Sequence, residues 1–199
     1  MGPTSVIDGA DALDERVLTA MVDCIGRWGI AKTTADDIAR TAGISRATLY
    51  RAFPGGKDVV FDALLQRETA RFFAAVTGPL EAAEHLEDLV VLGAVEAARF
   101  LAEHEALRYV IAHEPERVLP AFAFHRLDRV LALATSFAAP HLARFVADPN
   151  LAASGAEWLA RLLLSYATNP SPDLTLTDEA SVRTFVRTYV MPVLQPDQS

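Results

Sequence analysis

Cysteine is almost absent from this 199-residue chain: the single Cys24 excludes an internal disulfide and fits a reducing compartment. Signals for export or membrane insertion are missing too. The N-terminus has no basic stretch followed by an apolar one, so it does not resemble a signal peptide. The longest uncharged apolar run, 130–140, is too short to span a bilayer. We therefore expect a cytoplasmic protein with no membrane partner.

Motifs of catalysis and metal binding are also missing. The five histidines never occur at the i,i+3 or i,i+4 spacing that places two ligands on one helix face. The sequence contains no Gly-x-Ser-x-Gly or other recognisable nucleophile motif. We expect no enzymatic activity, no metal site and no cofactor.

Lysine is scarce, and its placement is informative. The chain has a formal net charge of -8, yet both of its lysines lie between residues 32 and 57, a stretch with five basic and two acidic residues. Salt screens charges over about 10 Å, so a local basic patch can bind a polyanion although the rest of the chain is acidic.

Strands with alternating polarity are missing, and the apolar spacing is helical throughout, which predicts an all-α fold. Gly29 is expected to end the first helix, and Gly78-Pro79 is expected to end the helix that begins near Lys57. The predicted helices span about 12–28, 34–42, 45–53, 57–76, 80–102, 106–113, 120–137, 141–147, 151–167 and 178–194.

Two short helices joined by Gly43-Ile44-Ser45 predict a helix-turn-helix. Thr34 and Ser45 are the expected N-caps, with Asp37 completing a capping arrangement at the first. The second helix of such a unit lies in the DNA major groove, where arginines can reach guanine or phosphate. Its basic, acid-free sequence therefore suits double-stranded DNA.

The stretch TTADDIARTAGISRATLYRAF, residues 33–53, with Lys57 just downstream, resembles the N-terminal DNA-binding domain of the TetR family of transcriptional regulators. The resemblance covers roughly Val17 to Leu65. Many members have one residue between the proline and the lysine, where this chain has Gly55-Gly56. The resemblance implies phosphate contacts by Thr34, Ser45, Tyr50 and Lys57, and base-facing positions for Arg46, Ala47, Thr48 and Arg51.

Nine aromatic residues occur between Phe72 and Trp158. Each taken alone is more simply a core residue, but together they exceed what a thin helical layer needs, and the resemblance implies an effector cavity. The predicted pocket residues, with the two histidines as polar groups that orient an apolar ligand, are Phe100, His104, Tyr109, Phe122, Phe124, His125, Phe137 and Trp158.

The last two predicted helices each carry an apolar stripe, so a pair from each of two chains can form a four-helix interface. The residues predicted at its core are Trp158, Leu162, Phe185 and Tyr189. A symmetric homodimer would read a near-palindromic operator.

The sequence thus predicts an all-α protein of two domains. Residues 13–58 form a three-helix, helix-turn-helix DNA-binding domain, and residues 59–196 form a larger helical domain for effector binding and dimerisation. The expected function is a dimeric repressor that an apolar small molecule releases from DNA. Two alternatives stay open: a DNA-binding regulator without an effector, and a lipid-binding or enzymatic helical protein.

Overall fold

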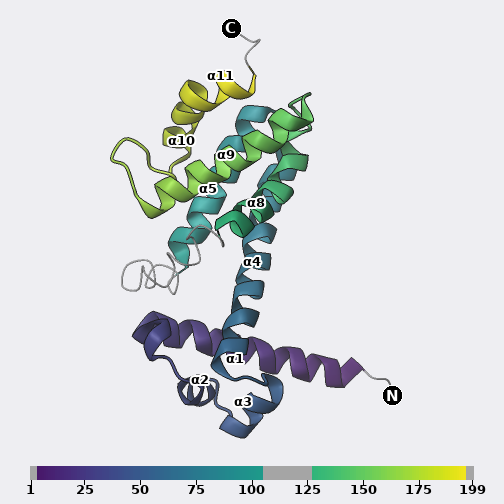
Figure 1. Cartoon of the computed structure of the whole chain (residues 1–199), viewed down its shortest axis with the longest axis vertical. Coiled ribbons are helices and arrows are strands. Elements are labelled where there is room, and N and C mark those ends of the chain that lie inside the picture. Colours follow the sequence, from purple (N-terminus) through teal and green to yellow (C-terminus); the bar gives the residue numbers. More distant parts are fainter. Residues whose placement is uncertain (1–3, 105–126, 196–199) are drawn as a thin grey trace. The chain divides into compact units, whose positions relative to one another are not determined.

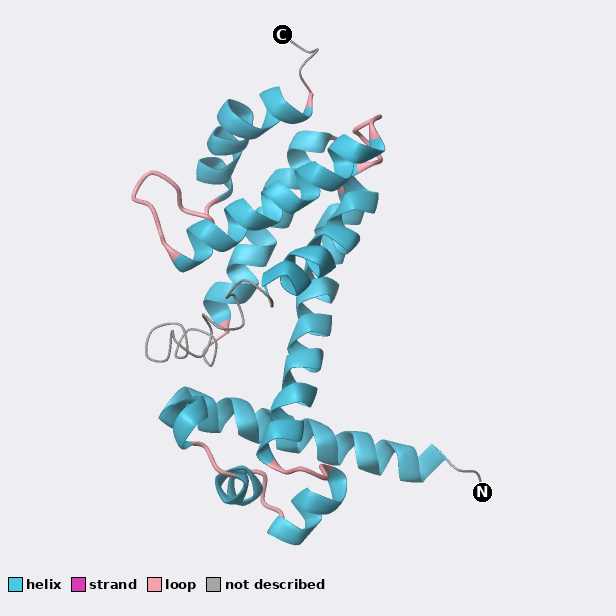
Figure 2. Cartoon of the chain, in the orientation of Figure 1, coloured by secondary structure: helices cyan, strands magenta, loops and turns pink. Residues whose placement is uncertain are grey.

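The computed structural model describes residues 4–104 and 127–195, and every regular element in these ranges is a helix (Figure 2). The all-α prediction is confirmed. The described residues form two compact units: residues 4–70 with His104, and residues 71–103 with 127–195.

The first unit contains α1 (Thr4–Lys32), α2 (Ala35–Thr41), α3 (Arg46–Ala52) and the beginning of α4 (Lys57–Ala82) (Figure 1). The helical path of α1 breaks at Gly29, where the sequence places its end. Apolar residues spaced along one face of each helix supply the core: Val17, Met21, Ile25, Ile38, Leu49, Phe53 and Val60 are all buried. Cys24 lies among them, and burial raises the pKa of its thiol.

The second unit contains the remainder of α4, α5 (Leu86–Glu103), α8 (Leu127–Leu142) and α9 (Pro149–Thr168), followed by α10 (Glu179–Phe185), η1 (Val186–Val190) and α11 (Met191–Leu194). Helix α8 packs along α9, and α5 contacts α9 and α10. The core between these helices is almost entirely aliphatic, because each contributes a stripe of Leu, Val and Ala.

Two proline-based helix ends were predicted wrongly. Helix α4 continues through Gly78-Pro79 to Ala82, and α8 continues through Pro140 to Leu142. An interior proline removes one hydrogen bond, but here apolar residues just beyond each proline, Leu80 and Leu142, are buried. The continued helix gains that burial, and the break falls instead at residues 83–85.

Arginines fix the helix ends of the second unit. Arg144 donates to the carbonyl oxygens of Leu80 and Ala83, both at 2.8 Å, and so satisfies the C-terminal turn of α4. Arg183 on α10 pairs with Glu87 at 2.7 Å and Asp88 at 2.8 Å on α5. Hydrogen bonds from Arg187 and Arg183 outweigh desolvation and hold the pKa of Glu87 below its ordinary value.

The last helical stretch contains a π turn, η1, where the amide of Met191 donates to the carbonyl of Val186 five residues earlier. Pro192 follows immediately and has no amide hydrogen to donate. One extra residue in the turn lets the chain pass this position while Val186 and Val190 both stay buried.

Candidate functional site

The N-terminus of α2 is closed by a reciprocal cap. The Thr34 amide donates to the Asp37 carboxylate at 3.1 Å, and the Asp37 amide donates to the Thr34 hydroxyl oxygen at 3.2 Å. The Thr34 hydroxyl also donates to the same carboxylate at 2.6 Å. These hydrogen bonds, with the neighbouring Arg40, lower the pKa of Asp37. The Thr34 hydroxyl proton expected at a phosphate is therefore held by Asp37 in the free protein.

Helix α3 begins at a second cap, because the Ser45 hydroxyl oxygen accepts from the Thr48 amide at 3.0 Å. Leu49 is fully buried, and Phe53, the C-cap residue four positions later, is buried as well. This i,i+4 pair fixes which side of α3 faces the core. The opposite side faces solvent and carries Arg46, Ala47 and Arg51, predicted to face bases, and Tyr50, predicted to contact phosphate. Thr48, also predicted to face bases, is half-buried beside them.

Arg46 is oriented by two neighbours in the free protein. Its guanidinium pairs with Asp36 of α2 at 3.0 Å, and it stacks over the ring of Tyr50 at 5.3 Å from the centroid. Both charged side chains are more than half exposed, so the pair holds a geometry more than it adds stability. Asp36 was not predicted as a site residue. A spacing of ten residues across a turn matches no helical period.

The turn between α2 and α3 is held from α1. Gly43 has a φ of +65°, a conformation that favours glycine, and Arg16 donates to the carbonyl of the preceding Ala42 at 2.7 Å. Arg16 thus positions the turn without reaching α3. Sequence inspection missed it because the contact spans 26 residues.

The glycine pair after α3 makes room for Tyr50. Gly56 has a φ of +67°, and a Cβ atom there would lie 2.9 Å from the Tyr50 ring, closer than real contacts allow. The absence of a side chain at Gly56 therefore leaves room for the Tyr50 phenol close to the backbone. Lys57 follows, and its ammonium donates a hydrogen bond to the carbonyl oxygen of Ile30, near the end of α1. The ammonium has three protons to donate, so the bond to Ile30 leaves others for a phosphate. The phosphate contact of Lys57 stays a prediction.

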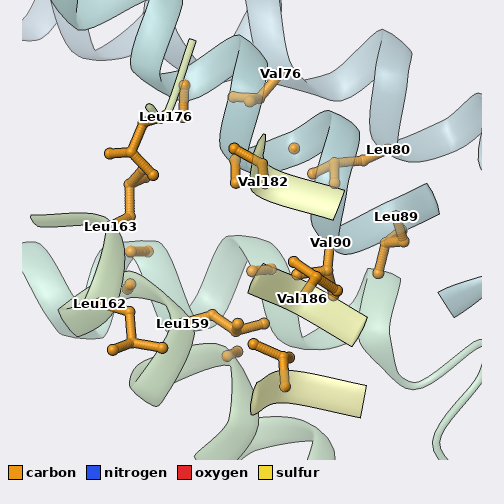
Figure 3. A pocket seen from close by; sticks show the side chains of 18 of the residues that line it. Val76, Leu80, Leu89, Val90, Leu159, Leu162, Leu163, Leu176, Val182 and Val186 are labelled. Atoms are coloured by element: carbon orange, nitrogen blue, oxygen red, sulfur yellow. The ribbon is translucent and has the colours of Figure 1, made fainter. Parts of the chain in front are cut away.

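A partly open cavity of about 160 Å³ lies within the second unit. Its wall comes from α4, α5, α8, α9, α10, η1 and the loop between α9 and α10. Figure 3 shows the labelled leucines and valines around it, all of them hydrocarbon side chains. Five aromatic residues join them: Phe72, Phe73, Phe137, Tyr166 and Phe185.

The structure brings only part of the predicted pocket set to this cavity. Phe137 lines it, whereas Phe100 and Trp158 do not. His104 lies 3.0 Å from the carboxylate of Glu68, in the first unit. The other four predicted residues, Tyr109, Phe122, Phe124 and His125, lie outside the described residues. The aliphatic majority of the wall was not predicted, because leucine and valine at core positions carry no signal for a void.

The four predicted interface residues also divide. Leu162 and Phe185 line the cavity of their own chain, and Trp158 packs against the core of the second unit. Tyr189 is 61% exposed, and Val193, one turn later, is 51% exposed. The outward apolar surface of the last helical stretch therefore centres on these two residues.

No helix within residues 4–104 and 127–195 combines the length and apolarity that crossing a membrane requires. In the same ranges no three or more His, Cys, Asp or Glu side chains gather where they could hold a metal ion.

Comparison with known proteins agrees with this geometry. The sequence profile of the family described as bacterial regulatory proteins, tetR family, matches residues 17–64. An uncharacterized HTH-type transcriptional regulator of Mycobacterium tuberculosis is 26% identical over 189 residues, 92% of this chain and 85% of that protein.

Solved structures share the fold over nearly the whole chain. The fatty acid degradation regulator FadR from Bacillus halodurans is 19% identical with a TM-score of 0.64, covering 100% of this chain and 98% of that one. The TetR family repressor AlkX from Dietzia sp., implicated in biodegradation of n-alkanes, is 20% identical with a TM-score of 0.61, covering 92% and 97%.

Proposed function

We propose that this chain, which belongs to the TetR family of transcriptional regulators, is a dimeric repressor that an apolar small molecule releases from its operator. It is a DNA-binding regulator of a family without enzymatic activity. We infer that residues 13–58 bind DNA and that residues 59–196 bind the effector and dimerise, in the cytoplasm.

The observation that carries DNA binding is the solvent-facing side of α3. Arg46, Tyr50 and Arg51 project from a short helix whose other side is fixed by buried Leu49. Arginine reads guanine through two hydrogen bonds in the major groove, and a tyrosine hydroxyl donates to phosphate. No acidic side chain occurs between Gly43 and Phe53 to repel the polyanion.

The cavity lined mainly by hydrocarbon side chains supports the proposal of an apolar effector. Two structural neighbours whose names refer to fatty acid degradation and to n-alkane biodegradation support an apolar class of compound. The mechanism is a population shift: DNA favours one conformation, and a ligand in the cavity favours another. Linkage makes the coupling reciprocal, so the compound that weakens DNA binding is itself bound less tightly in the presence of operator.

A mobility-shift titration tests the function, using the DNA upstream of this chain's own gene and full-length protein. We expect saturable binding to one near-palindromic fragment and weak, salt-sensitive binding to a scrambled fragment. Arg51→Ala should weaken operator binding, whereas Arg161→Ala, an exposed arginine on α9, is the matched control. Equal binding to operator and scrambled DNA would contradict the proposal.

Sedimentation at micromolar concentration tests the dimer. Tyr189→Asp should shift the protein toward monomer, because it places a charge on the outward apolar surface of the last helical stretch. Leu133→Asp, at a 48% exposed position on α8, is the control and should leave the mass unchanged. A monomeric wild-type protein would rule out the dimer.

Operator release distinguishes the effector-controlled repressor from the alternatives. A regulator without an effector would bind operator but would not be released by apolar compounds. A lipid carrier would bind such compounds but show no preference for operator.

A further inference from the structure

The cavity wall selects a narrower class of ligand than apolar compounds in general. Among the described residues that line it, none carries a formal charge, and Tyr166 alone has a polar side-chain atom. A carboxylate or phosphate inside this wall would lose its hydration and find no cationic partner among them. The ion pairs of Arg183 and Arg187 with Glu87 lie outside the lining and already satisfy one another.

The volume of the cavity matches a ligand of about one ring. An engineered cavity of about 150 Å³ in another protein, lined by Leu, Ile and Phe, stays dry and binds benzene. The cavity here is about 160 Å³ with a closely similar lining. A long acyl chain or a sterol has several times as many heavy atoms as benzene and would extend beyond this volume.

The rings in the wall favour an aromatic occupant. Phe73 packs edge-to-face against Phe72, with the ring centroids 5.4 Å apart, and it also packs against Phe137, with the centroids 4.4 Å apart. Tyr166 on α9 and Phe185 on α10 form a second edge-to-face pair, with the ring centroids 5.5 Å apart. The rings of both clusters line the cavity, and an aromatic ligand would pack against them as they pack against each other.

We propose that the ligand of this cavity is a small uncharged hydrocarbon, a monocyclic arene on the order of six to eight carbon atoms, packed against the uncharged side chains that the described residues contribute to the wall. This rests on the proposed function, because it names the class of effector for that cavity.

The decisive comparison uses toluene and benzoate, which have the same number of carbon atoms and differ in charge. Each is titrated by calorimetry into full-length protein without DNA, with cyclohexane as the non-aromatic compound. We expect saturable binding of toluene, weaker binding of cyclohexane, and benzoate affinity at least about 100-fold below that of toluene. A thermal shift with toluene that benzoate does not give would agree.

A matched pair of variants locates the ligand. Ala134 lines the cavity, whereas Ala132 on the same helix is exposed. Ala134→Leu fills the space and should lower toluene affinity at least about tenfold, while Ala132→Leu should bind like wild type. Ala94→Leu, from the α5 side of the wall, repeats the test if the first variant does not fold.

Benzoate or a fatty acid that binds as tightly as toluene would overturn the ligand class and leave effector control intact. Undetectable toluene binding to wild-type protein, or toluene binding unchanged in both filled variants, would overturn it as well. These titrations contain no DNA, so a failed operator test would count against the proposed function alone.

Discussion

The solvent-facing side of α3 and the cavity of the second unit are assembled at different ranges along the chain. Arg46, Tyr50 and Arg51 are aimed by a cap at Ser45 and by Leu49, all within seven residues. The cavity draws its wall from six helical segments and a loop, spread from Phe72 to Val190. The solvent-facing side of α3, called the reading surface below for its proposed contact with DNA, can therefore be changed one side chain at a time. The cavity depends instead on the packing of the whole second unit.

The largest effect is expected where the reading surface depends on burial. Leu49→Ala removes a fully buried side chain from beneath α3 and should cost about 2–5 kcal/mol of stability, with loss of operator binding. Leu65→Ala, at a 48% exposed site on α4, is the control and should cost under about 0.5 kcal/mol. Chemical denaturation measures both. Equal costs would mean that Leu49 does not support α3.

The next effect concerns base reading. Arg46→Ala and Arg51→Ala should each lose about 1–3 kcal/mol of discrimination at defined operator positions. Tyr50→Phe should instead weaken binding to all sequences alike, since it removes the predicted phosphate contact. Binding to a panel of single-substitution operators separates the two patterns. If all three variants bound the panel like wild type, α3 would not be the reading helix.

A smaller effect is expected in the second unit, through pH. The folded pKa of Glu87 lies below its ordinary 4.5, so its contribution is present above that pH and is lost as pH falls through the folded pKa. Glu87→Gln should cost about 1 kcal/mol near pH 7 and flatten the acid limb of the stability curve. Glu157→Gln, which breaks a half-exposed i,i+4 pair, is the control. An unchanged acid limb in Glu87→Gln would assign the acid sensitivity to other carboxylates.

The smallest effect tests the exposed pair at the reading surface. Asp36→Asn releases Arg46 and removes one negative charge next to the proposed DNA-binding surface, so affinity for scrambled DNA should rise by a factor of about two to five. Operator preference should fall, because the guanidinium loses an orienting partner. Asp23→Asn, an exposed acid on α1, should do neither. Stronger preference in Asp36→Asn would mean that Asp36 competes with DNA for Arg46.

The three-helix unit could be read from the sequence because its signals are local. The caps at Thr34 and Ser45 and the glycine at 43 act over three or four residues and recur in the structure as predicted. Helix ends at Pro79 and Pro140 could not be read the same way. Whether a proline ends a helix depends on what the following residues bury, and that burial comes from segments far along the chain.

The places of the predicted pocket and interface residues also depend on contacts between distant segments, which local sequence patterns do not reveal. Helical periodicity identifies Leu162 and Phe185 as apolar positions but does not say whether they face their own core or a second chain. Both line the cavity, while Tyr189 four residues after Phe185 stays exposed. The shift at the π turn changes which residues share a side, and only the position of Pro192 hints at it.

A wall whose described residues offer mainly apolar contacts, with the Tyr166 hydroxyl as their one polar side-chain group, is a coarse chemical sensor. Each added methylene changes burial by about 0.8 kcal/mol, roughly a fourfold change in affinity, until a ligand becomes too large to fit. Neighbouring members of a homologous series would then be distinguished only weakly. A regulator built on this cavity would respond to the summed concentration of a mixture rather than to one compound, and its threshold would follow the composition of that mixture.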